Sequence, residues 1–135
     1  YGTAAFQWGT TPLSSSEEFG YGGAERGRAY SPSELTGDRG ASVTVEVRKN
    51  FRPESFNLAF QPFVTYEAGM VKNLDSTDGR IESATSVGAG VRVYAPNGVS
   101  SEFVVSKPLT RNLENPPRYA SEDGLQVLFS LQKTF

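Results

Sequence analysis

Apolar and polar residues alternate at every second position along most of this sequence, and that alternation restricts its fold more than any other feature. Over residues 125–135 the apolar side chains share one face of an extended strand, which only Lys133 interrupts. The same alternation recurs over residues 1–10, 42–48, 58–67, 83–95 and 99–107. No stretch shows a convincing 3.6-residue period of helical length. The sequence therefore predicts an all-β chain with six up-and-down antiparallel strands.

Two architectures are compatible with this alternation. In a soluble sandwich the apolar faces meet each other, whereas in a membrane barrel they meet lipid and the polar faces line a wet lumen. Mean hydropathy is -0.40, and the sequence has no run of about 18 apolar residues, which excludes a transmembrane helix but not a barrel. The 14 glycines and 12% aromatic residues suit strands and turns.

The lengths of the connections separate the two architectures. They are long at residues 11–40, 72–82 and 108–123, and short at residues 49–57 and 96–98. Outer-membrane barrels alternate long extracellular loops with short periplasmic turns, so the C-terminus is expected on the periplasmic side. About eight strands are needed to close such a barrel. We therefore expect residues 1–135 to be the C-terminal segment of a transmembrane barrel, whose upstream strands and periplasmic domains are absent here.

Several classes of function are disfavoured by composition. The chain has no Cys and no His, which removes thiolate chemistry and the commonest metal ligand and general base. Thirteen basic and fifteen acidic residues give a net charge of -2 without a contiguous basic tract, so nucleic acid is not an expected partner. Taken alone, the loop glycines and acids have an ordinary interpretation as turn and solvated residues. We expect no catalytic residue, no metal, no cofactor and no enzymatic activity.

Motifs follow one another in a fixed order along the chain. The long loop contains Gly22-Gly23, then Arg28-Ala29-Tyr30, then Leu35-Thr36-Gly37-Asp38-Arg39-Gly40, and the next strand ends with Glu46-Val47-Arg48. Later motifs are Pro62-Phe63-Val64-Thr65-Tyr66-Glu67-Ala68-Gly69, Lys107-Pro108-Leu109 and the closing Phe129 to Phe135.

This series resembles the outer-membrane translocators of two-partner secretion, of the haemolysin-activator and filamentous-haemagglutinin transporter type. They form part of a superfamily that includes the barrel-assembly proteins. The chain departs from the family pattern at Ala29, where Gly is common, and at Glu67, where Asp is usual. The resemblance implies a pore in the bacterial outer membrane that moves a partner exoprotein of haemolysin or adhesin type from the periplasm to the cell surface.

The resemblance also implies a role for particular residues. It implies that the loop over residues 11–40 folds back into the pore, where Arg28 meets Glu67. The alternation independently puts Glu67 on the polar face, where a guanidinium could bind it bidentately. The residues expected to anchor the loop are Arg28, Tyr30, Phe63, Glu67 and Gly69; those expected to shape it are Gly22, Gly23, Gly37, Asp38 and Gly40. The expected assembly signal is Phe129, Leu131 and Phe135.

The expected partners are a secreted polypeptide, outer-membrane lipid and the barrel-assembly machinery. Two alternatives remain open at this point. One is a factor that inserts other barrel proteins into the membrane, as in the assembly branch of the superfamily, although Lys107-Pro108-Leu109 favours secretion. The other is a soluble β-sandwich binding module, which detergent dependence would distinguish from both membrane proteins.

Overall fold

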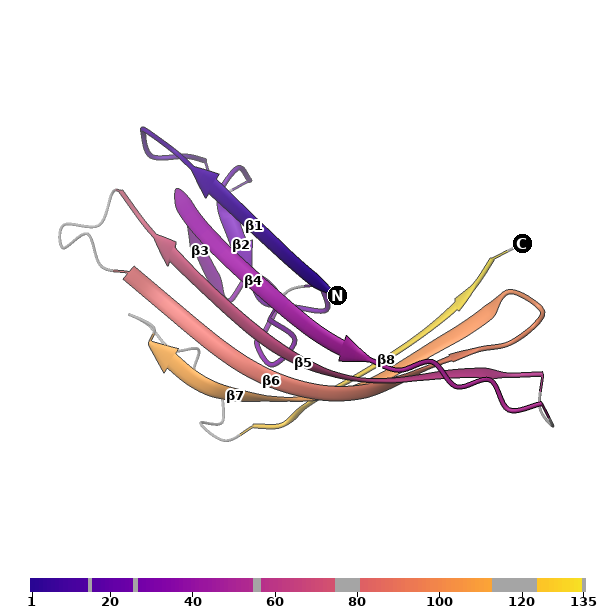
Figure 1. The fold of residues 1–135 in the computed structure, drawn as a ribbon. Coiled ribbons are helices and arrows are strands. Elements are labelled where there is room, and N and C mark those ends of the chain that lie inside the picture. The colour runs from indigo at the N-terminus through magenta and orange to yellow at the C-terminus, as the bar shows by residue number, and fades with distance from the viewer. Residues whose placement is uncertain (15, 26, 55–56, 75–80, 113–123, 135) are drawn as a thin grey trace.

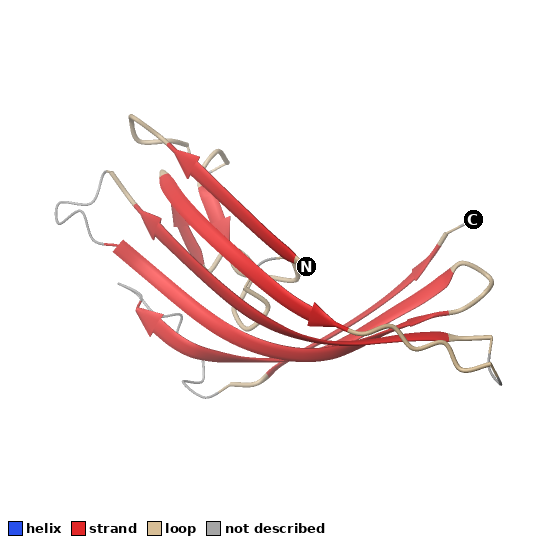
Figure 2. Cartoon of the chain, viewed as in Figure 1, coloured by secondary structure: helices blue, strands red, loops and turns tan. Residues whose placement is uncertain are grey.

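The computed structural model describes residues 1–14, 16–25, 27–54, 57–74, 81–112 and 124–134. Six antiparallel strands form one curved, unclosed sheet in the order β1-β4-β5-β6-β7-β8, and two short strands form a separate sheet (Figures 1 and 2). The strands are β1 (Gly2–Trp8), β2 (Phe19–Tyr21), β3 (Leu35–Gly37), β4 (Arg39–Arg48), β5 (Ala59–Lys72), β6 (Ile81–Tyr94), β7 (Val99–Asn112) and β8 (Gln126–Lys133). The predicted all-β, antiparallel architecture is confirmed.

Within the described ranges, there is no helix long and apolar enough to cross a membrane.

Each of the six predicted stretches forms one strand of the large sheet, but four of the strands, β4, β5, β6 and β7, are longer than predicted. β5 continues to Lys72, β6 begins at Ile81, and β7 passes Pro108 to reach Asn112. Proline donates no hydrogen bond to a ladder, and the pairing of β6 with β7 shifts register between Thr85 and Ser86, opposite this proline. The strand therefore continues through a bulge at the point where the alternation appeared to end.

The prediction of a single loop over residues 11–40 was wrong in part. β2 and β3 pair within it as an antiparallel hairpin, and β4 begins at Arg39. Strands of three residues are too short to display a repeating alternation, so no periodic signal marked them. The region predicted as one loop therefore consists of the β2–β3 hairpin, with one connection before β2 and one after β3.

In the large sheet, the burial pattern is the reverse of that in a soluble protein: apolar side chains are exposed and polar side chains are buried. On the face that carries Val45, large apolar side chains are exposed, and Val45 itself is 48% exposed. On the opposite face polar side chains are buried, and Glu67 is only 1% exposed. A soluble sandwich would bury the apolar face against a second sheet, and no described residue covers it. This pattern is typical of a barrel wall between lipid and a wet lumen.

An arginine placed on the apolar face should therefore destabilise the protein in a bilayer. We expect Val45→Arg to lower the free energy of unfolding by about 2–4 kcal/mol if Val45 lies near the bilayer midplane. Ser130→Arg is the matched control, because Ser130 faces the polar side opposite Glu102 and should change stability little. Denaturant titration of the protein in lipid vesicles measures both, and equal effects would contradict this assignment of faces.

Candidate functional site

The β2–β3 hairpin packs against the polar face of β4 and β5. Its buried apolar side chains form a core cluster with two residues of the large sheet. The cluster comprises Phe19, Tyr21, Ala29, Tyr30 and Leu35 from the loop and Val71 and Ala84 from the sheet. The Tyr21 and Tyr30 rings lie 6.0 Å apart, and burial raises the pKa of Tyr21 well above its usual range, so its phenol stays protonated. The buried apolar core thus fixes the loop to the wall.

Two glycines of the wall make room for the aromatic rings of the hairpin. A Cβ atom at Gly69 would lie 2.4 Å from Cδ2 of Tyr21, and one at Gly40 would lie 2.2 Å from Cδ1 of Phe19. Any side chain at either position would occupy the space of the ring above it. Both positions were singled out from the sequence, Gly69 as an anchor and Gly40 as a loop-shaping residue.

Arg28 and Glu67 meet at the inner end of the loop. The Nη1 atom of Arg28 lies 3.1 Å from Oε1 of Glu67, and the backbone N–H of Arg28 donates to Oε2 at 2.8 Å. The hydroxyl of Ser86 also donates to Oε2, at 3.3 Å. The two side chains are 11% and 1% exposed, so the ion pair is largely shielded from water.

The geometry of this pair differs from the expected bidentate grip. A single guanidinium nitrogen reaches the carboxylate, because the backbone N–H of Arg28 occupies the second oxygen, while Nε of Arg28 donates to the carbonyl of Ala24 at 3.3 Å. Glu67 therefore binds the backbone of the loop as well as the arginine side chain.

A tight turn presents Arg28 to the wall. Gly22 and Gly23 have φ angles of 124° and 105°, values that residues with a Cβ rarely adopt. The N–H of Gly23 donates to the carbonyl of Tyr30 at 3.1 Å, which closes the chain around Arg28. Gly37, in β3, lies against the backbone of Lys72, where an added Cβ would stand 3.0 Å from the Lys72 oxygen.

Tyr30 reaches into the irregular part of the β6–β7 ladder. Its hydroxyl lies 2.5 Å from the carbonyl oxygens of both Thr85 and Thr110, at the register shift opposite Pro108. Because proline has no N–H, the bulge leaves carbonyl groups for the phenol to bind. The sequence singled out Tyr30 and Lys107-Pro108-Leu109 separately, and the structure brings the two motifs together.

Removal of the Tyr30 hydroxyl should weaken this contact without changing the packing of the ring. We expect Tyr30→Phe to reduce the stability of the docked loop by about 1–3 kcal/mol, because the single phenol proton that the two carbonyls share is lost. Amide hydrogen exchange across residues 19–37 measures the loss. Tyr66→Phe is the matched control, since Tyr66 is exposed on the apolar face. Equal protection in wild type and Tyr30→Phe would contradict the assigned contact.

Asp38 joins three segments at the end of the sheet that carries the long connections. Its Oδ1 accepts the N–H of Leu13 at 2.5 Å, and its Oδ2 accepts the N–H of Leu74 at 2.7 Å. The hydrogen bonds from Leu74 and Leu13 lower the pKa of the Asp38 carboxyl. Asp38 thus fixes the connection before β2 and the one after β5 to the start of β4.

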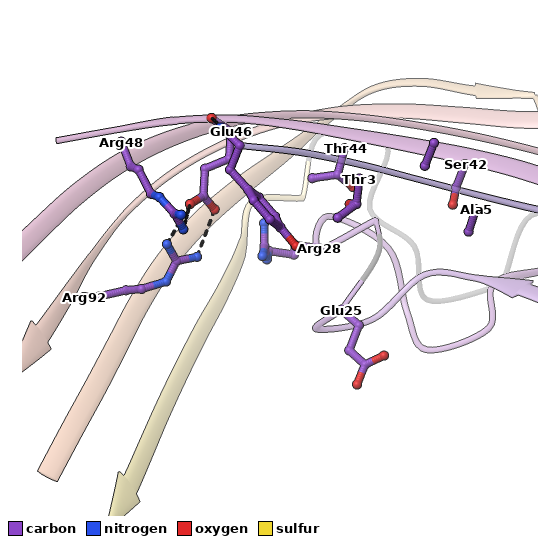
Figure 3. Close-up of a pocket in the computed structure, with 11 residues that line it drawn as sticks. Thr3, Ala5, Glu25, Arg28, Ser42, Thr44, Glu46, Arg48 and Arg92 are labelled. Atoms are coloured by element: carbon purple, nitrogen blue, oxygen red, sulfur yellow. Dashed lines mark hydrogen bonds and ion pairs between the residues drawn. The ribbon is translucent and has the colours of Figure 1, made fainter. Parts of the chain in front are cut away.

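Phe63 lies apart from the Arg28 contact. It is buried beneath the guanidinium of Arg92, whose Cζ is 4.0 Å from the ring centre. Arg92 binds Glu46 bidentately, with Nη1 at 2.7 Å from Oε1 and Nη2 at 2.9 Å from Oε2 (Figure 3). Arg92 also donates to Glu102 through Nε and to Gln61 at 3.0 Å. The expected anchor Phe63 therefore supports a second ionic cluster on the wall.

Arg92 was not predicted from the sequence to be a site residue. Alternation already placed Glu46, Gln61, Arg92 and Glu102 on polar faces, but only the strand register shows that they are neighbours. An open cavity of about 610 Å³ separates this cluster from the loop. Figure 3 shows Glu25 and Arg28 on the loop side of the cavity and Glu46, Arg48 and Arg92 on the wall side.

The residues expected to form an assembly signal lie on β8. Phe129 and Leu131 are 69% and 66% exposed on the apolar face, where they continue the row of lipid-facing side chains. Phe135 lies outside the described residues, as do the predicted loop regions at residues 75–80 and 113–123. Among the residues that the structure covers, no group of three or more acidic side chains could hold a metal ion.

A sheet with one exposed apolar face, and with a loop packed on its buried polar face, defines a segment of a transmembrane β-barrel. A sequence model described as "Haemolysin secretion/activation protein ShlB/FhaC/HecB" matches residues 1–93, and the chain belongs to this family. The family comprises outer-membrane transporters of two-partner secretion, which confirms the resemblance and the expected location in the outer membrane. The matched region includes the loop, Glu67 and Arg92. No curated protein matches the chain.

Proposed function

We propose that this chain supplies part of the wall and the gating loop of a pore that moves an unfolded exoprotein of haemolysin or adhesin type from the periplasm to the cell surface. The observation that carries the proposal is the contact of Arg28 with Glu67, which fixes the loop on the polar face of the wall. Opening the pore then requires this contact to break or the loop to move. The chain acts by transport, without a catalytic step.

The contacts between the loop and the wall hold the loop in place but allow it to be released. Glu67 of the wall binds the loop, and Asp38 at the end of the loop binds Leu13 and Leu74, through hydrogen bonds that water can replace when the loop leaves. The rings of Phe19 and Tyr21 rest on Gly40 and Gly69 of the wall, so no side chain at these two positions has to move. The client is handled by exposed backbone and polar groups of the lumen, while the apolar face contacts lipid.

Secretion of the partner protein tests this function. In the full-length protein, Arg28→Ala should reduce secretion at least about tenfold, because a loop that has lost one member of a shielded ion pair, at a cost of about 3–5 kcal/mol, no longer returns to one defined position on the wall. The barrel itself should remain inserted, which resistance to denaturation in detergent and surface labelling both measure.

Glu25→Ala is the control for loss of a loop charge. Glu25 is exposed and has no hydrogen-bond or ion-pair partner within the described residues, so its removal should leave secretion unchanged. Normal secretion by Arg28→Ala in a correctly inserted barrel would refute the proposed gating role.

The exposed row on β8 leads to a second expected partner. Phe129 and Leu131 face the lipid side of β8, where the barrel-assembly machinery would bind them during insertion. A role for the protein in inserting other barrels is the competing function. Normal levels of other outer-membrane proteins after deletion of the gene, with loss of one secreted partner, would favour secretion.

A further inference from the structure

Charged side chains are distributed unequally between the two faces of the large sheet. In the described part of the strands, the acids all fall on the polar face: Glu46, Glu67, Glu82 and Glu102. The charged residues on the apolar face are all cations: Arg39, Lys72, Lys107 and Lys133. A face that meets lipid and carries only positive charge is suited to contact negatively charged headgroups.

One of these cations is a direct neighbour of a tryptophan, and a second lies beside the first. Trp8 of β1 pairs with Arg39 of β4, and Arg39 pairs with Lys72 of β5, so the three side chains form one row across the sheet. We call this row the cationic rim. It lies at the end of the strands that carries the long connections, beyond the apolar side chains of Phe6 and Met70, which are 80% and 51% exposed. Tryptophan and basic residues at the border of an apolar band are typical of a membrane interface.

Arg39 is held in place by two contacts, and part of its guanidinium makes no hydrogen bond with the described residues. Its Cζ lies 4.1 Å from the centre of the Trp8 ring, and its Nε donates to the carbonyl of Gly9 at 2.7 Å. Within the described residues, neither its two Nη atoms nor the Lys72 ammonium has a hydrogen-bond or ion-pair partner. The carboxylate oxygens of the adjacent Asp38 accept the backbone N–H groups of Leu13 and Leu74. Among the described residues, the rim therefore presents a positioned guanidinium and a lysine ammonium, both with donors that make no hydrogen bond.

We propose that the cationic rim binds the phosphate group of a phosphorylated glycolipid in the cell-surface leaflet of the outer membrane. Arginine offers paired donors that match phosphate oxygens, and lysine adds a second charge beside them. The exposed Phe6 and Met70 side chains lie where the acyl chains of the same lipid would run. The choice of leaflet rests on the proposed function, since the orientation of the long connections comes from it.

Lipid binding to the full-length protein in detergent tests the rim. Native mass spectrometry should detect a complex with lipid A that carries two phosphates. Each cation near a lipid surface contributes about 1 kcal/mol, so an Arg39→Gln/Lys72→Gln variant should bind this lipid about 30-fold more weakly. Lys107→Gln/Lys133→Gln removes the same charge from the same face, away from Trp8. This control should bind within about twofold of wild type.

Three other ligands distinguish the sources of the phosphate. The affinity of the wild-type protein for dephosphorylated lipid A should be as low as the affinity of the rim variant for lipid A. Millimolar inorganic phosphate should not displace lipid A from the wild-type protein. Phosphatidylglycerol should bind more weakly than lipid A. Equal losses in the rim and control variants, equal binding of dephosphorylated lipid A, displacement by inorganic phosphate, or a preference for phosphatidylglycerol would each overturn the proposal.

The lipid test is independent of the secretion test. Arg28→Ala should keep wild-type affinity for lipid A, because Arg28 lies on the opposite face of the sheet from the rim. Loss of secretion with lipid binding retained supports both proposals. Normal secretion by Arg28→Ala would refute the gating role. The lipid proposal would then be tested by the rim variants alone.

Discussion

Replacement of Glu67 with alanine is expected to weaken the attachment of the loop to the wall strongly. Glu67 binds the side chain and backbone N–H of Arg28 as well as the hydroxyl of Ser86, and it is 1% exposed. Its removal leaves the Arg28 charge without a partner in a shielded site, at a cost of about 3–5 kcal/mol. Amide hydrogen exchange over residues 19–37 should then be faster by a factor of about 100 or more.

Conservative and remote variants separate the ion pair from general damage. Glu67→Asp, which restores the usual family residue, should keep part of the protection because a carboxylate remains. Glu25→Ala should leave exchange unchanged. Wild-type protection of the loop in Glu67→Ala would mean that the apolar cluster alone holds it, and the ionic contact would lose its assigned role.

Introduction of a side chain at Gly69 is the second change with a large expected effect. A Cβ at this position would lie 2.4 Å from the Tyr21 ring, and the backbone of a central strand cannot retreat to relieve the overlap. Overpacking typically costs about 1–3 kcal/mol, and valine adds two methyl groups beyond Cβ. We expect Gly69→Val to displace the β2–β3 hairpin while the six-stranded sheet remains folded.

Spin labels measure that displacement. This chain contains no cysteine, so labels can be attached at Glu25 on the loop and Gln132 on the wall, in a protein otherwise free of cysteine. Gly69→Val should broaden the distance distribution between them. Gly2→Val is the matched control, because a Cβ at Gly2 meets only the Thr44 carbonyl oxygen, at 3.7 Å. An unchanged distribution in Gly69→Val would contradict the close contact of Tyr21 with the wall.

The strands and their faces were predictable because a period of two residues assigns each side chain to a face without any tertiary information. This assignment put Glu67 on the polar side, and the family resemblance supplied Arg28 as its partner. The exposed apolar face then distinguished a barrel wall from a sandwich. The bidentate geometry was not predictable, because it depends on the position of a backbone N–H that only the folded loop defines.

The remaining contacts depend on register and on short elements that leave no periodic signal. The Arg92 cluster joins residues on β4, β5, β6 and β7, and a shift of one residue between any two strands would separate them. The contacts of Asp38 with Leu13 and Leu74 span 25 and 36 residues. The hydroxyl of Tyr30 binds carbonyls that become available only at a bulge. Sequence patterns identified several of these residues but not their partners.

The loop is thus held by contacts at several places rather than by one ion pair. Glu67 binds its inner turn, Tyr30 inserts at the bulge, and Asp38 holds its outer end. A client entering the lumen would have to displace these contacts together or use the cavity beside Arg92. Because Arg28 and Glu67 contact each other directly, their effects on transport should depend on one another.

A double-mutant comparison of secretion tests the central claim most directly. Arg28→Ala, Glu67→Ala and the combined variant are compared for the amount of partner protein released by cells with equal amounts of inserted barrel. If the contact between the two residues gates the pore, each single variant should reduce secretion strongly, and the double variant should secrete about as much as either single one. Wild-type secretion by both single variants, or losses that add in the double variant, would contradict it.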